Sequence, residues 1–226
     1  MILGAALLGA VLGALAAGPA VAHHVGVYVP RDNPVSANFK EIKFAIQARK
    51  LDVALQLFER GGLRAEMRAR AATLPPGLEA ATAAALGAGD AREAERHLMI
   101  FFSALARDLA REAERQLADP RTPAGSRLGA GQRFLDAIWR YYNLIDFAVS
   151  MRDSKTSVAI RLAFDEAESS ARGPAAPAAV APGAGSPPAA PARAADLDRL
   201  RASLGRIAQL LSNLIDASST PARRDS

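Results

Sequence analysis

The stretch spanning residues 90–117 constrains the fold of this chain more than any other segment. Its apolar residues recur at steps of three and four, which places them on one face of a helix: Ala94, Leu98, Phe101, Phe102, Leu105, Leu109, Ala113 and Leu117. Asp90 is suited to cap the start of this helix, and Pro120 follows its end. A long helix with a single apolar face has to bury that face, so the stretch predicts the central member of a helical bundle.

The composition also favours helices over strands. Apolar residues make up 50% of the chain and aromatic residues only 5%, and many of the apolar residues are alanine, the strongest helix former. A further helical pattern begins at Asn33 or Ser36. Other helical patterns cover roughly residues 51–60, 63–74, 77–86, 132–152 and 154–170, and turns that contain Gly or Pro separate most of them. We therefore predict an all-α fold, an antiparallel up-and-down helical bundle with a linker-tethered C-terminal helix.

The N-terminal residues 1–22 have the character of a signal peptide. They are continuously apolar, are broken by Gly18-Pro19 and end in Ala20-Val21-Ala22, although no Lys or Arg precedes the apolar run. Cleavage after Ala22 would place the protein in the periplasm or outside the cell. The alternative is an N-terminal membrane anchor that stays attached. Residues 23–35 follow as an extended segment, and residues 36–172 form the predicted bundle domain.

Residues 173–194 consist almost entirely of Pro, Ala and Gly, which predicts a linker. Residues 195–218 then form an amphipathic helix, and residues 219–226 a polar tail. The apolar seam of this helix alternates steps of three and four: Leu197, Leu200, Leu204, Ile207, Leu211 and Leu214. We expect the seam to dock on the bundle, to pair with a second copy, or to bind another envelope protein.

Several functional classes are excluded by what the sequence lacks. The chain has no cysteine, which rules out disulfides, zinc–thiolate sites and cysteine nucleophiles. It also has no glycine-rich phosphate loop, no G-x-S-x-G elbow and no H-E-x-x-H motif, so we predict that it is not an enzyme. The formal net charge is +5, but acids and bases are interspersed along the helices. This pattern argues against nucleic-acid binding and allows only loose attraction to an anionic membrane surface.

One candidate metal site emerges from the three histidines. After cleavage, His23 would offer an α-amine and an imidazole beside His24, and such nitrogen ligands suit copper. The remaining histidine, His97, shares a helical face with Glu93, four residues earlier. His23, His24, His97 and Glu93 therefore form a predicted site for copper or, less favoured, iron, if the N-terminal segment folds back over the central helix. Otherwise His97 is a packed side chain, and His23 and His24 are polar terminal residues.

The acidic residues Asp136, Asp146, Asp165 and Glu166 are a second candidate set. Asp146 falls near the predicted core, so we expect an ion pair with Arg140, Arg152 or Arg161. A carboxylate iron site is the alternative, but the chain has no Glu-x-x-His, the motif that di-iron bundles repeat.

These patterns lead to two functional hypotheses. The first is a secreted, non-enzymatic helical bundle of the bacterial envelope that binds or delivers a transition metal. The second is a metal-free adaptor or assembly subunit that binds a partner protein, or itself, through the C-terminal helix. An enzyme that uses buried carboxylates ranks third.

Overall fold

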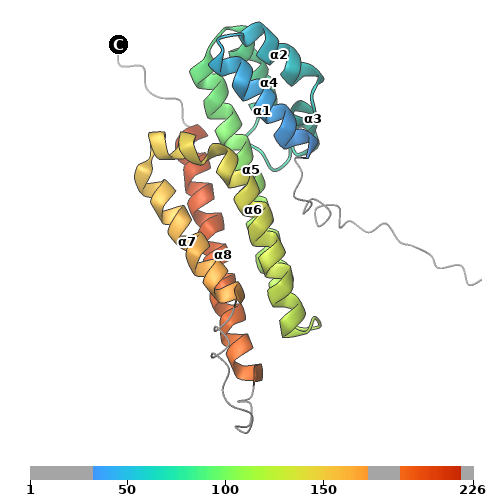
Figure 1. Ribbon diagram of the computed structural model, residues 1–226. Coiled ribbons are helices and arrows are strands. Elements are labelled where there is room, and N and C mark those ends of the chain that lie inside the picture. The colour runs from blue at the N-terminus through green and yellow to red at the C-terminus, as the bar shows by residue number, and fades with distance from the viewer. Residues whose placement is uncertain (1–32, 173–188, 220–226) are drawn as a thin grey trace, which may run out of the picture.

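The structure, a computed structural model, describes residues 33–172 and 189–219, and every regular element in these two ranges is a helix. Four long helices run antiparallel in chain order and form a four-helix bundle: α5 (Ala91–Leu117), α6 (Ala124–Arg152), α7 (Ser154–Arg172) and α8 (Ala189–Ser219). Helix α5 packs between α6 and α8, and α7 packs between the same two helices on the other side (Figure 1). The predicted all-α bundle is confirmed.

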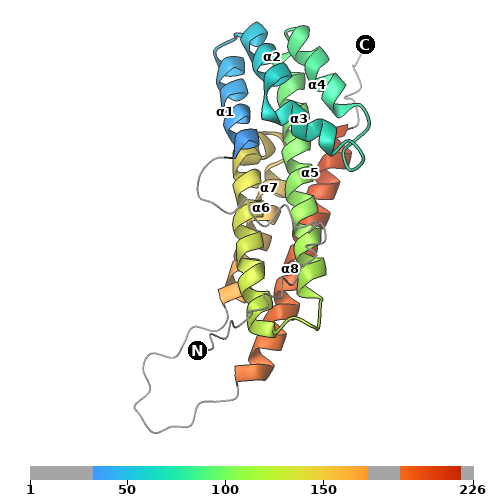
Figure 2. The same ribbon diagram turned by 90° about the vertical axis from the view of Figure 1, so that its right-hand side faces the viewer.

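Four shorter helices form a cap around the first half of α5: α1 (Pro34–Gln47), α2 (Leu51–Arg60), α3 (Gly62–Ala69) and α4 (Leu78–Gly87). Figure 2 shows this cap at one end of the molecule, with α1 lying above the C-terminal end of α6. The contact between α1 and α6 begins at Asn33, whose side-chain amide donates a hydrogen bond of 2.9 Å to the hydroxyl of Tyr141. The cap and the bundle therefore contact each other through α1 and α6, beside α5.

The start of α1 is fixed by a capping box. The side chain of Asn33 accepts a hydrogen bond from the backbone N–H of Ser36, and the Ser36 hydroxyl accepts one from the backbone of Asn33. Pro34 occupies the first turn, where its missing N–H costs no helical hydrogen bond. Of the two predicted caps, Asn33 is the one that the structure uses.

Helix α6 begins earlier than the sequence pattern indicates. Glycine, serine and proline between residues 120 and 131 predicted a turn, with the helix starting near residue 132, but the helix starts at Ala124. Gly131 lies inside this helix at a close helix contact, since a Cβ on it would lie 2.5 Å from the Leu200 side chain of α8 and 3.5 Å from that of Leu117. Tertiary packing of this close helix contact outweighs the weak local preference.

The C-terminal helix docks on the bundle of its own chain. The six seam residues are at most 4% exposed and face α5 and α7: Leu197, Leu200, Leu204, Ile207, Leu211 and Leu214. In this position they are inaccessible to another protein, and a partner could reach them only if α8 left the bundle. Residues 173–188 of the predicted linker lie outside the described residues, as do residues 1–32. Among the helices of residues 33–172 and 189–219, none is long and apolar enough to cross a bilayer.

Candidate functional site

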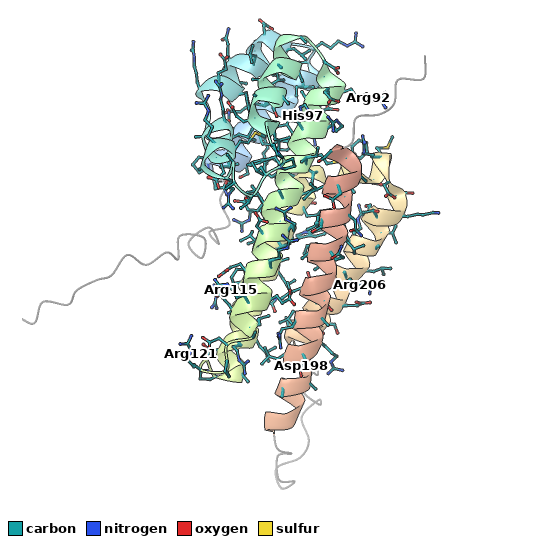
Figure 3. All side chains as sticks on the ribbon, turned by 180° about the vertical axis from the view of Figure 1, so that it is seen from behind. Arg92, His97, Arg115, Arg121, Asp198 and Arg206 are labelled. Carbon is teal, nitrogen blue, oxygen red and sulfur yellow. The ribbon has the colours of Figure 1, made fainter. Side chains whose placement is uncertain are left out.

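Two of the four predicted metal ligands lie together near the start of α5. The Nε2 atom of His97 is 3.2 Å from Oε1 of Glu93, as their spacing of one helical turn predicted. Figure 3 labels His97 near this end of the helix. His23 and His24 fall outside the described residues, so the structure contributes one imidazole and one carboxylate to the predicted site. In the described part of the chain, no three His, Asp or Glu residues converge in a way that could hold a metal ion.

Arg96 occupies the space that a cation would need beside these two groups. Its guanidinium donates to Glu93 at 2.9 Å and lies 3.0 Å from Nε2 of His97. The same guanidinium donates to the backbone carbonyl of Ser218, in the last turn of α8, where helix carbonyls lack helical partners. Arg96 therefore pairs with Glu93 and links α5 to the C-terminal end of α8.

The local electrostatics follow from this arrangement. Hydrogen bonding to Arg96 lowers the pKa of Glu93, so the carboxylate stays ionised. Burial, reinforced by the charge of Arg96, lowers the pKa of His97 and keeps its imidazole neutral. A neutral imidazole is the form that binds metals, but the guanidinium against it repels a metal cation. The Nδ1 atom of His97 is buried and has no hydrogen-bond partner among the described residues.

The lowered pKa of His97 gives a testable pH dependence. In the unfolded chain, the imidazole of His97 has its ordinary pKa of 6.5. Below this pH the unfolded chain therefore binds a proton that the folded chain, in which this pKa is lowered, does not bind. As the pH is lowered from about 7.5 to about 5, we expect the free energy of unfolding to decrease. The decrease should be smaller in His97→Gln. Urea unfolding of both proteins at the two pH values measures the effect, and the difference between wild type and variant separates His97 from the carboxylates that begin to titrate near about pH 5. The same pH dependence in wild type and variant would contradict it.

The four acidic candidates do not converge. Asp146 forms the predicted ion pair with Arg161, whose Nε is 3.1 Å away, and also accepts a hydrogen bond of 3.2 Å from the Ser157 hydroxyl. Glu166 pairs with an α8 residue, Arg206, at 3.1 Å. Asp136 and Asp165 are exposed. These contacts are structural ion pairs between neighbouring helices, and they give no shared carboxylate site.

A cleft of about 400 Å³ lies between α1, the start of α5 and the end of α6, and sequence reasoning did not find it. We call it the α1–α5–α6 cleft. Its apolar walls comprise Phe39, Ile46, Leu98, Met99, Leu144, Ile145, Phe147, Ala148 and Met151. Its polar lining comprises Lys43, Gln47, Arg92, Glu95, Arg96 and Arg152.

Two large apolar residues at the cleft are exposed to solvent. Phe147 is 71% exposed and Met151 is 73% exposed, one helical turn apart on α6. The buried residues of this part of α6 are Tyr142, Ile145 and Val149, so Phe147 and Met151 lie off the face that packs into the bundle. This departure from the helical pattern is the one sequence signal that could have pointed to the cleft.

The charges of the cleft gather at one of its ends. Helices α5 and α6 are antiparallel and adjacent, so the first turns of α5 lie beside the last turns of α6. A contact between the rings of Phe102 and Tyr141, 5.9 Å apart, fixes this alignment. Four of the five charged lining residues lie at the start of α5 (Arg92, Glu95 and Arg96) and at the last residue of α6 (Arg152), and apolar residues follow towards the bundle. The fifth, Lys43, lies on α1.

Comparisons with known proteins add no functional assignment to this geometry. No protein family, curated protein or solved structure matches the chain. The function is therefore inferred from the contacts, burial and charges described above, with the α1–α5–α6 cleft as the principal candidate site.

Proposed function

We propose that this protein is a non-enzymatic binding protein of the bacterial envelope, and that it holds an apolar small molecule in the α1–α5–α6 cleft. The observation that carries the proposal is the combination of a concave apolar site with two exposed apolar side chains, Phe147 and Met151, at its lining. The envelope location is inferred from the predicted signal peptide at residues 1–22.

The size and composition of the cleft support ligand binding. Its volume of about 400 Å³ falls within the range of about 300–1,000 Å³ that is usual for small-molecule sites. Phe39 and Leu98 are buried within its wall, which gives a firm apolar surface. Met99 and Met151 have flexible, polarisable side chains that adapt to different apolar shapes. Grouped exposed apolar residues, unlike scattered ones, mark a site of interaction.

The charged groups at the cleft suit binding better than catalysis. Three of them are arginines, Arg92, Arg96 and Arg152, whose guanidinium groups carry a positive charge. Such groups attract and orient an anion but do not exchange protons with a substrate. This is the support for the non-enzymatic part of the proposal.

The test is the binding of an uncharged fluorescent probe, N-phenyl-1-naphthylamine, whose emission rises in apolar surroundings. We expect saturable binding to the full chain and an affinity lower by about tenfold in Ala148→Trp, because the indole fills the cleft. Ala65→Trp is the matched control, since Ala65 is exposed on α3, which does not line the cleft. Equal probe affinity in wild type and Ala148→Trp would contradict the proposal.

Copper handling is a second candidate function. It is favoured by the buried Nδ1 atom of His97, which has no hydrogen-bond partner among the described residues and could donate a lone pair to a metal ion. It requires His23 and His24 to approach α5 despite the charge of Arg96. Titration of the mature chain with Cu(II) should then show tight stoichiometric binding that His97→Ala abolishes, and equally weak binding by both would exclude the site.

A further inference from the structure

We infer that the ligand of the α1–α5–α6 cleft is a free long-chain fatty acid, bound with its carboxylate at the arginine-rich end and its alkyl chain along the apolar walls. This inference rests on the proposed function and adds the chemical class of the ligand. The distribution of charge along the cleft supports this class of ligand.

The cleft is polar at one end and apolar along the rest of its length. Arg92 and Arg96 belong to the first turns of α5, and Figure 3 labels Arg92 near the cap end of that helix. Arg152 lines the same cleft, which places the end of α6 close to these turns. Leu98 and Met99 follow Arg92 by about two helical turns on α5, where they form part of the apolar walls. A single-chain amphiphile has this same division into a charged head and an apolar tail.

The sign of the charge selects an anionic head. The lining contains four cations, Lys43, Arg92, Arg96 and Arg152, and one carboxylate, Glu95. Arg96 is already paired with Glu93. Among the described residues, Arg92 and Arg152 have no ion-pair partner. By contrast, Arg115, near the far end of α5, and Arg121, in the turn after that helix, each pair with a carboxylate. Two guanidinium groups are thus available to a ligand.

The chemistry of guanidinium and the size of the cleft favour a carboxylate on one chain. Arginine binds carboxylates through two parallel hydrogen bonds, a geometry that a neutral alcohol or amide does not reproduce. The volume of about 400 Å³ is near the lower end of the range for small-molecule sites, which suits one acyl chain better than a two-chain phospholipid. The exposed side chains of Phe147 and Met151 add apolar surface to the lining of the cleft.

The experiment compares two ligands of equal chain length, palmitate and hexadecanol, as competitors of N-phenyl-1-naphthylamine on the full chain. We expect palmitate to displace the probe at a concentration lower by about tenfold, and this advantage to shrink as NaCl is raised. In the double variant Arg92→Gln/Arg152→Gln, palmitate should lose about tenfold in affinity while hexadecanol and the probe are unaffected. Arg133→Gln, at an exposed position on α6 outside the cleft, is the matched control and should bind like wild type.

The outcomes separate this inference from the proposed function. Probe binding that is sensitive to Ala148→Trp, together with equal displacement by palmitate and hexadecanol, overturns the fatty-acid inference and leaves the proposed function intact. An equal loss of both competitors in the double variant also overturns it, because the arginines would then act on the shape of the cleft and not on charge. Probe binding that is insensitive to Ala148→Trp overturns both. Thermal unfolding of each variant, at an unchanged midpoint, shows that the fold is preserved.

Discussion

Replacing Phe102 with alanine is expected to lower the free energy of unfolding by about 3–5 kcal/mol, the largest single-residue effect that we predict. Phe102 is 0% exposed on α5, and its ring contacts those of Phe39 on α1 and Tyr141 on α6, at 4.6 and 5.9 Å between centroids. The loss of one ring therefore leaves a cavity where the cap, α5 and α6 meet. Urea denaturation followed by circular dichroism measures the effect.

Phe147→Ala is the matched control, because it deletes the same ring from a side chain that is 71% exposed. Its free energy of unfolding should differ from wild type by no more than about 0.5 kcal/mol. If Phe102 packs at the junction of the cap and the bundle, Phe102→Ala must lower the free energy of unfolding much more than Phe147→Ala does. A small effect of Phe102→Ala, comparable to that of Phe147→Ala, would show that this junction is not packed as described.

Leu204→Ala is expected to destabilise the protein by about 2–5 kcal/mol. Leu204 is 0% exposed in the middle of the α8 seam, which packs against α5 and α7. Because α8 completes the four-helix bundle, a cavity at this position should weaken the whole domain and give one cooperative transition at lower urea concentration.

The control on the same helix is Arg206→Ala. Arg206 pairs with Glu166, but the two side chains are 52% and 53% exposed, so the ion pair is screened by water and contributes only about 0–1 kcal/mol. If Leu204→Ala instead changed the oligomeric state and left the unfolding free energy unaltered, α8 would not dock on its own chain. The interpretation of the seam as a partner-binding surface would then be favoured.

Much of the architecture could be predicted from the sequence because it depends on residues close together along the chain. The apolar steps of residues 90–117 predicted α5 almost to the residue, with Asp90 as its cap. The seam of α8 was recognisable from its spacing. The expected burial of Asp146 predicted an ion pair with one of three arginines, and Arg161 is the one that forms it. Periodicity does not identify the surface that a seam packs against, so the docking of α8 became clear only in three dimensions.

The α1–α5–α6 cleft could not be predicted for the same reason. Its walls come from three helices whose relative placement depends on long-range contacts such as that between Phe39 and Phe102. Phe147 and Met151 depart from the apolar pattern of α6, but two apolar residues off the buried face do not by themselves indicate a cleft. The predicted metal site shows a different limit: the spacing brought Glu93 and His97 together, but it did not reveal that Arg96 would lie against both.

The most direct test of ligand binding in the cleft uses the methyl groups of methionine as reporters. Met99 and Met151 line the cleft, whereas Met67 is buried in the cap on α3, away from it. In NMR spectra of the chain labelled at the methionine methyl carbons, addition of palmitate should shift the resonances of Met99 and Met151 in a saturable way and leave that of Met67 in place. Resonances of Met99 and Met151 that stay unchanged at saturating palmitate, or that move no more than that of Met67, would contradict binding in this cleft.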